Sequence, residues 1–156
     1  MKTIQITDQS EIEQIIQQCA YCVVSVVQPD GMPYSFPMNF AYESGRIILH
    51  SGPEGSHLRC LASNNAVSVV FCVGDELVYQ HKEVACSYRM RSKSVVCKGR
   101  VRFVESDEQK VVELNKLMKQ YTPKEFRYSA PAIRNVKVWI VDISEMTARA
   151  FGVPHK

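Results

Sequence analysis

One stretch, from Pro33 to Ser56, constrains the fold of this chain more than any other. It reads PYSFPMNFAYESGRIILHSGPEGS, and Ser35 to Tyr42 and Arg46 to Ser51 have strand-forming residues with partly alternating polarity. Glu43-Ser44-Gly45 between them has the composition of a hairpin turn. Gly52-Pro53-Glu54-Gly55 then leads into a predicted helix, whose first backbone N–H groups lack partners within the helix and carry partial positive charge. The stretch therefore predicts two antiparallel strands followed by a helix start that can bind a phosphate group.

The rest of the chain alternates between runs of β-branched residues and amphipathic segments. Apolar residues recur at helical spacing in Asp8 to Gln18, which predicts a helix with Ser10 and Glu13 placed as a capping box. A second amphipathic helix is predicted over Asp107 to Tyr121. The remaining segments are predicted strands at Tyr21 to Val27 and Ala66 to Val73, a stretch from Val84 to Val104 that is long enough for two strands or for one strand strongly bent at Gly99, an irregular stretch from Pro123 to Pro131, and a last strand from Val136 to Ile143.

Short strands with helices inserted between them, rather than alternating with them, predict a mainly β fold. We expect a closed antiparallel barrel with peripheral helices, formed as one domain by residues 1–156. The length and the hydrophobic content of 46% are sufficient for one full core. The sequence has no G-x-G-x-x-G after a strand and no P-loop motif, so neither of these nucleotide sites is predicted.

Charge and cysteine content narrow the class of protein further. The net charge of +3 is small and the basic residues are scattered, which disfavours binding to nucleic acid. There is no signal-peptide core and no apolar run of about 20 residues, so we expect a cytoplasmic protein without a membrane span. Reduced thiols follow from that expectation. Cys19-Ala20-Tyr21-Cys22 matches C-x-x-C, but it lies where a helix ends, which raises a thiol pKa, so we interpret the pair as buried small residues.

Five segments carry a resemblance to a known family. They are Asp30-Gly31-Met32-Pro33-Tyr34, Pro37-Met38-Asn39-Phe40-Ala41-Tyr42, His50-Ser51-Gly52-Pro53-Glu54-Gly55, Ser94-Val95-Val96 with Gly99-Arg100-Val101, and the segment from Trp139 to Arg149. In this order and spacing the chain resembles the FMN-binding split barrels of the pyridoxamine 5'-phosphate oxidase-like superfamily, and within it the nitroimidazole-resistance (Nim-type) flavoproteins. The resemblance implies a homodimer of six-stranded split barrels with FMN held between the subunits.

Position by position, the resemblance implies a cofactor site built from two strands, the glycine loop and a later strand. His50 is the candidate catalytic residue, as a proton donor or a substrate contact. The expected FMN-binding residues are Met38 and Asn39 beside the flavin ring, Leu49, His50 and Ser51 offering groups to it, Ser56 and His57 at the phosphate, Lys93, Ser94 and Val95 at the ring or ribityl chain, and Arg149 as a further candidate.

Two departures from the family pattern affect the expected function. His57 stands where relatives usually have Lys or Arg, and a neutral imidazole predicts weaker phosphate binding unless Arg59 or Lys93 supplies charge. The strand Ser35 to Phe40 lacks the R-x-x-x-L-K cations of pyridoxamine 5'-phosphate oxidase, so vitamin B6 oxidation is not expected.

Several residue groups keep two interpretations. His50, His57 and Cys60 could suggest a metal site, but a loop separates them and no carboxylate completes the set, so none is expected. Tyr121, Phe126, Tyr128 and Trp139 could line a substrate pocket or simply pack. The alternating basic residues Arg89, Arg91, Lys93, Lys98, Arg100 and Arg102 could form an anion-binding face or a solvated exterior, and Lys93 is the innermost candidate.

The sequence therefore predicts an FMN-dependent oxidoreductase that reduces small electrophiles such as 5-nitroimidazole-type compounds. The alternative is a flavin- or haem-binding protein without turnover, with His50 or His81 as an axial iron ligand. A third interpretation is an empty structural dimer, in which His57 weakens phosphate binding too far.

Overall fold

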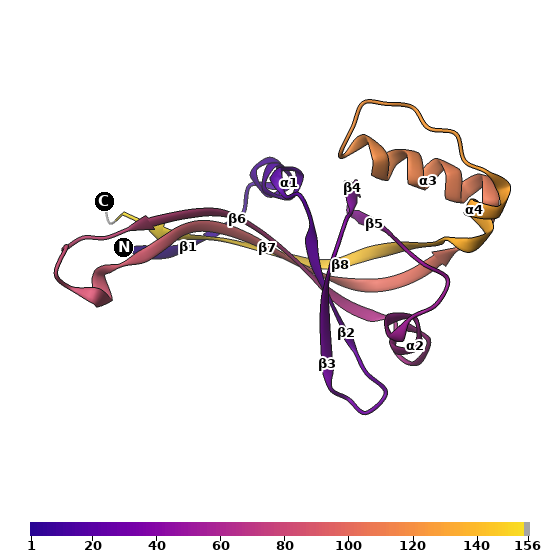
Figure 1. The fold of residues 1–156 in the computed structure, drawn as a ribbon. Coiled ribbons are helices and arrows are strands. Elements are labelled where there is room, and N and C mark those ends of the chain that lie inside the picture. The colour runs from indigo at the N-terminus through magenta and orange to yellow at the C-terminus, as the bar shows by residue number, and fades with distance from the viewer. Residues whose placement is uncertain (155–156) are drawn as a thin grey trace.

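The computed structural model describes residues 1–154, and their strands form one eight-stranded antiparallel sheet (Figure 1). The strand order is β3-β2-β6-β7-β8-β5-β4, and β1 pairs with β8 beyond the end of β5. One edge of the long β8 therefore carries β5 and then β1, while its other edge pairs with β7. The strands are β1 (Lys2–Ile6), β2 (Cys22–Val27), β3 (Pro33–Met38), β4 (Ala41–Glu43), β5 (Arg46–Ser51), β6 (Ala66–Val78), β7 (Arg89–Val104) and β8 (Lys137–Val153).

The sheet is open, because the strands at the two ends of the order, β3 and β4, do not pair in the described part of the chain. The prediction of a closed barrel was wrong in this respect. The expected split-barrel class is confirmed, although the sheet has eight strands instead of six. The opening arises at Asn39 and Phe40, where the chain leaves β3 and starts β4, so the predicted strand from Ser35 to Tyr42 is divided between two sheet edges.

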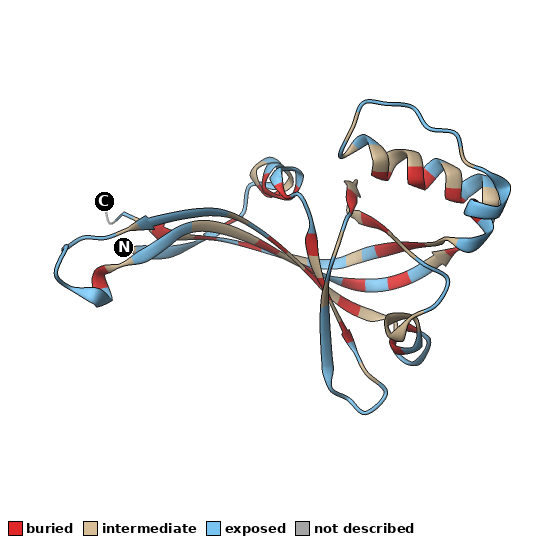
Figure 2. Cartoon of the chain, in the orientation of Figure 1, coloured by how far each residue is buried: buried red, intermediate tan, exposed pale blue. Residues whose placement is uncertain are grey.

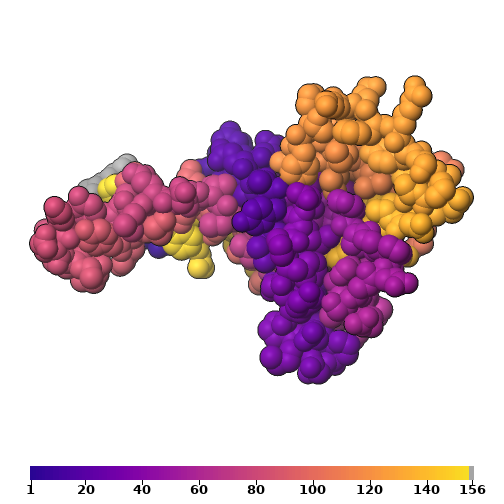
Figure 3. Space-filling view, in the orientation of Figure 1, coloured from indigo at the N-terminus to yellow at the C-terminus, as the bar shows by residue number. Residues whose placement is uncertain are grey.

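β6 and β8 extend well beyond their predicted limits, whereas β7 lies within the predicted stretch from Val84 to Val104 and is one continuous strand. β6, β7 and β8 contain 13, 16 and 17 residues. β6 continues through a register shift between Val73 and Glu76, so the polar Gly74-Asp75 segment forms a bulge instead of the predicted strand end. Together with β7 and the short 3-10 helix η1 (Ala85–Ser87), it forms a hairpin arm that projects from the body (Figures 1 and 3). The arm is mostly exposed (Figure 2).

The four α-helices lie at the periphery, and their ends follow local capping signals. The carboxylate of Asp8 accepts a hydrogen bond from the Glu11 backbone N–H at 2.9 Å, so Asp8 is the N-cap of α1 and the predicted Ser10–Glu13 capping box was wrong. Ser106 caps α3, and Ser129 caps α4, which lies partly in the segment predicted to be irregular. The helices are α1 (Gln9–Gln18), α2 (Ser56–Ser63), α3 (Asp107–Lys119) and α4 (Ala130–Asn135).

Two apolar clusters form the core (Figure 2). The larger one packs α1 and α2 against the sheet and contains Phe40 and Phe71, whose rings lie edge to face at 4.8 Å. The smaller one lies under α3 and α4, against β5 and β8. The buried carboxylate of Glu113 on α3 accepts hydrogen bonds from Arg46 at 3.3 Å and from Gln109 at 2.8 Å, which fixes α3 to the β4–β5 hairpin.

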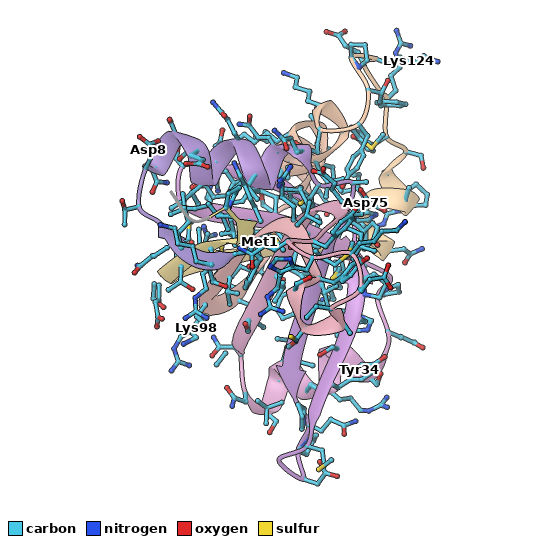
Figure 4. The ribbon with its side chains drawn as sticks, turned by 90° about the vertical axis from the view of Figure 1, so that its left-hand side faces the viewer. Met1, Asp8, Tyr34, Asp75, Lys98 and Lys124 are labelled. Atoms are coloured by element: carbon cyan, nitrogen blue, oxygen red, sulfur yellow. The ribbon has the colours of Figure 1, made fainter. Side chains whose placement is uncertain are left out.

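The described helices include none that is both long and apolar enough to cross a membrane. In Figure 4, which views the molecule from the side, Tyr34 on the β2–β3 hairpin lies near the bottom and Lys124, in the loop after α3, lies at the top.

Gly99 marks the predicted irregularity in β7, where the pairing with β8 shifts register between Lys98 and Gly99. A Cβ atom at this position would lie 2.2 Å from the backbone oxygen of Asp142, which is far inside van der Waals contact. Only glycine lets the two strands approach so closely.

We expect Gly99→Ala to lower the free energy of unfolding by about 2 kcal/mol or more, because β7 and β8 must separate to make room. Urea denaturation measures this change. Gly52→Ala is the control, since a Cβ there meets nothing within 4 Å, and it should shift the unfolding free energy by no more than about 1 kcal/mol. Equal midpoints for the two variants would contradict this account of the bulge.

Candidate functional site

A cavity of about 320 Å³ opens where the sheet divides between β3 and β5. It lies at the ends of these two strands and beside the first turn of α2, the three elements predicted from the stretch Pro33 to Ser56. Its walls are Phe36, Pro37, Met38, Asn39, His50, Ser51 and His57. The fold thus brings together, within one chain, the strand residues and the helix start that the sequence placed around a cofactor.

His57 is held over the glycine loop by two aromatic rings. Its imidazole lies 5.3 Å from the Trp139 ring and 5.7 Å from the Phe36 ring, centroid to centroid. Gly55 adopts φ +150°, and a Cβ there would lie 2.3 Å from the imidazole, so this glycine is what allows the ring to fold back over the loop. The Nε2 atom is buried and has no hydrogen-bond partner in the protein. Burial lowers the pKa of His57, so the imidazole in this environment is neutral near pH 7.

Ser51 links the end of β5 to the core. The Trp139 indole N–H donates to the Ser51 hydroxyl at 3.1 Å, and this hydroxyl donates to the Gly52 carbonyl at 3.0 Å. These bonds use the only hydroxyl proton, so Ser51 fixes the start of the glycine loop and has acceptor capacity left for a ligand.

His50 is shared between two cavities. Besides the first, it lines a second cavity of about 230 Å³ under α3 and α4, together with Tyr128. The Nδ1 atom of His50 and the hydroxyl of Tyr128 are both buried without a hydrogen-bond partner in the protein. Burial lowers the pKa of His50 and raises the pKa of Tyr128, so both side chains are uncharged near neutral pH.

Two of the expected FMN-binding residues belong to the core instead. Leu49 and Val95 have no exposed surface, and Val95 is paired on both sides, with Phe71 of β6 and Ala148 of β8. Ser56 starts α2 as expected, next to His57.

The remaining expected residues lie in a different part of the sheet. Ser94 of β7 is directly opposite Arg149 of β8, and Lys93 lines a cavity of about 480 Å³ at the base of the arm. Phe103, which pairs with Trp139, follows Ser94 by nine residues in β7, and this corresponds to about 30 Å along the strand. The first cavity and the cavity lined by Lys93 have no lining residue in common.

Lys93 is not an inner cation. Its amine donates to Glu11 at 2.7 Å, and its side chain is 45% exposed. Other members of the basic series have similar partners, since Arg91 pairs with Glu76, Lys98 with Glu145 and Arg102 with Asp142. These exposed pairs agree with the interpretation of the series as a solvated exterior.

The structure also agrees with the interpretation of the cysteine pair as buried small residues. Cys19 and Cys22 are both buried, and burial raises the pKa of Cys22 to about 12. A thiol of this kind is unreactive.

Of the four aromatic residues left open by the sequence, Tyr128 and Trp139 prove relevant to the cavities. The Tyr121 hydroxyl accepts the Phe40 backbone N–H at 2.9 Å and so serves packing, and Phe126 is exposed. Phe36 in the first cavity and the apolar face of α3 that walls the second cavity were not predicted as site residues from the sequence. The helical spacing of Leu114, Leu117 and Met118 was the available signal for that wall, but it did not show which strand residue the helix would face.

Comparison with known proteins places this geometry in context. The sequence model of the family described as Pyridoxamine 5'-phosphate oxidase matches residues 8–150. The crystal structure of a candidate 5-nitroimidazole antibiotic resistance protein from Bacteroides thetaiotaomicron is 48% identical, with a TM-score of 0.88, over 96% of this chain and 88% of that one. A comparison with curated proteins found no match.

Two more distant structures share the fold. An FAD and heme binding protein from Mycobacterium smegmatis is 18% identical with a TM-score of 0.86, over 97% of this chain and 76% of that one. A flavocytochrome from Azotobacter vinelandii is 19% identical with a TM-score of 0.84, over 96% and 70%. The family match spans almost the whole sheet and the cavity between β3 and β5, and this chain belongs to the pyridoxamine 5'-phosphate oxidase family.

Proposed function

We propose that the protein is an FMN-dependent oxidoreductase that reduces small nitro compounds of the 5-nitroimidazole type. The observation that carries the proposal is the buried, unpartnered Nε2 of His57, held beside the first turn of α2 in the cavity between β3 and β5. A buried polar atom without a partner is costly, which favours a ligand that supplies one. The first turn of α2 supplies free backbone N–H groups at the same place. These donors fit the phosphate end of a flavin mononucleotide.

The remaining wall residues fit the ring end of the same cofactor. Met38 is the last residue of β3, and Asn39 follows it. The Asn39 side chain is exposed and can form hydrogen bonds with a heterocycle. His50 lies on the opposite wall and can hold or give a proton through its neutral imidazole. When bound, FMN supplies the transfer of electrons from a reduced donor to the acceptor. The chain's own residues orient the cofactor, exclude water and position a proton at His50.

The proposal includes a homodimer with FMN at the subunit interface. Lys93, Ser94 and Arg149 do not line the first cavity, so a second chain that supplies them would let one flavin contact both groups. The arm also carries exposed Leu77, Tyr79 and Met90, a kind of surface that marks an interaction site. Six free thiols agree with the cytoplasmic location that we include in the proposal.

We base the substrate class on the charge and polarity of the residues around the site, and on the 48% identity to the Bacteroides protein. Pyridoxamine 5'-phosphate needs cations to bind its phosphate. β3 has none, and the exposed Arg149 is the cation left at the C-terminal position where the oxidases use Arg and His. The second cavity, which is mostly apolar, instead suits an uncharged ring.

A second candidate is a flavin- or haem-binding carrier, and the unpartnered Nδ1 of His50 is the observation that favours it. His81 is less suitable as an iron ligand, because it lies exposed in the arm. An absorption spectrum distinguishes the two: flavin bands in the purified protein support the oxidoreductase, whereas a Soret band that His50→Ala abolishes supports the haem carrier. Reduction by NADH or NADPH followed by reoxidation with a nitroimidazole separates an enzyme from a flavin carrier.

We expect purified protein to be yellow and to bind one FMN per chain as a dimer. Gly55→Ala should weaken FMN binding about tenfold or more, because the new methyl group displaces the His57 ring. Fluorescence titration with FMN measures the dissociation constant, and light scattering measures the mass. Gly52→Ala, in the same loop but with free space around it, should bind FMN like the wild type. A colourless protein with no saturable FMN binding would refute the proposal.

We also expect FMN binding to depend on the protonation of His57. Burial holds the pKa of His57 below its usual 6.5 in the free protein, and a bound phosphate raises it. Binding therefore takes up a proton, and affinity falls as the pH rises from about 6 to about 8. His57→Arg keeps a planar cation against Phe36 and Trp139 and should bind FMN more tightly, by about tenfold near pH 8.

FMN itself also ionises in this pH range. Comparing the dissociation constants of wild type and His57→Arg at each pH cancels this effect, because it is the same for both proteins. The dissociation constant of the wild type divided by that of His57→Arg should grow as the pH rises, since the arginine stays charged throughout. His81→Arg adds the same charge in the arm and should leave the dissociation constant unchanged. A ratio that stays constant with pH would show that His57 does not contact the phosphate.

A further inference from the structure

The second cavity, under α3 and α4, has no role in holding the cofactor in the function proposed above. It is lined by six apolar residues and by two residues with polar groups, His50 and Tyr128. The apolar residues are Leu114, Leu117, Met118, Ala132, Ile133 and Val136. Its volume of about 230 Å³ is below the 300–1,000 Å³ or so of pockets for drug-sized ligands, so it suits a single small ring.

The walls of this cavity are fixed by bonds outside it. On α3, Glu113 binds Arg46, and Lys116 donates to Glu43 at 2.8 Å. On α4, the Ile133 carbonyl accepts from the buried Lys110 amine at 3.3 Å. Both helices are thus tied down without using the polar groups of His50 and Tyr128, and the space is preformed instead of being a gap that can collapse.

Two hydrogen-bonding groups in the wall are unsatisfied. The Tyr128 hydroxyl and the His50 Nδ1 are buried, have no protein partner and are not bonded to each other. In a protein interior such groups are nearly always paired, so two around one cavity point to a ligand that pairs with them. Both side chains are uncharged, since burial raises the pKa of Tyr128 and lowers the pKa of His50.

The two hydrogen-bond donors determine which chemical group of a ligand this cavity can bind. The phenol donates one proton, and a neutral imidazole donates from Nδ1 in one of its two tautomers. Two donors call for two acceptor atoms close together, as in a carboxylate or a nitro group. No cation lines the cavity, so burying a carboxylate there would cost far more than burying a neutral nitro group.

We propose that this cavity is the acceptor subsite of the protein: it holds the ring of a small neutral nitroaromatic compound, whose nitro oxygens accept hydrogen bonds from Tyr128 and His50. The inference rests on the proposed function only for the direction of electron flow. His50 lines both cavities, so the nitro group lies next to the wall of the proposed flavin site. Tyr128 is then a specificity-determining residue, contributed by the loop before α4.

Three probes of similar shape test this chemistry without any turnover. Calorimetric titration of the FMN-loaded protein, with no reductant, gives the dissociation constants of nitrobenzene, toluene and benzoate. We expect nitrobenzene to bind about tenfold more tightly than toluene, which lacks acceptors, and benzoate to bind weakest because of its charge. Equal binding of nitrobenzene and toluene, or no binding of either, would overturn the proposal.

Tyr128→Phe removes the hydroxyl alone. It should weaken nitrobenzene binding about tenfold and leave toluene binding unchanged, so the ratio of the two constants falls to about one. Loss of both ligands together would indicate a structural effect and would overturn the assigned role of the hydroxyl. Tyr34→Phe, on the distant β2–β3 hairpin, is the matched control and should leave the ratio as in the wild type.

A second variant tests the location by filling the space. Ala132→Leu on α4 should abolish binding of nitrobenzene and toluene while FMN binding is retained, and Ala130→Leu, on the same helix but outside the cavity, should change neither. Retained nitrobenzene binding in Ala132→Leu would place the ligand elsewhere. Should the protein bind no FMN, the same titrations on the cofactor-free chain still decide the subsite, so failure of the flavin proposal and failure of this one are distinguishable.

Discussion

The indole of Trp139 connects the core to the site, and the geometry of the first cavity depends on it. The side chain is fully buried on β8, between Phe103 of β7 and Leu49 of β5 in register. From there its ring lies against the tilted ring of His57 and its N–H donates to Ser51. A slip of one residue in the pairing of β8 would turn the indole to the other face of the sheet, and both contacts would be lost.

The first cavity contains no fully charged side chain. Both histidines that line it are neutral, because burial lowers the pKa of each. A phosphate there would meet only the partial charge of the α2 start until His57 takes up a proton. A histidine at this position would make phosphate affinity depend on pH, whereas an arginine would keep its charge throughout the range. The contacts of the His57 ring with the tilted rings of Phe36 and Trp139 set its position whether or not it is charged.

The local parts of the fold could be predicted from the sequence, and the parts that depend on distant contacts could not. Periodicity located α1, α3 and the strand β2, and the glycine loop located α2. The open sheet, β1 and the full length of β8 depend on pairing between distant segments, which periodicity does not encode. The same limit applied to the cavities. The residues from Pro37 to His57 are close in sequence and were predicted together, but Tyr128 reaches His50 only through the packing of α3 and α4.

The arm is the part of the fold with the least support from its own chain. Leu77, Tyr79 and Met90 are about half exposed, although burying such a side chain fully contributes about 1.5–3 kcal/mol. Pairing of β6 with β7 and stacking of Tyr79 on Tyr88 at 4.8 Å hold the hairpin together, while most of its residues stay exposed in the described part of the chain. In the proposed homodimer, a partner that covers the arm would also bring its own first cavity toward Lys93 and Ser94. The same surface would then stabilise the arm and complete the cofactor site, so loss of the dimer would cost stability and flavin binding together.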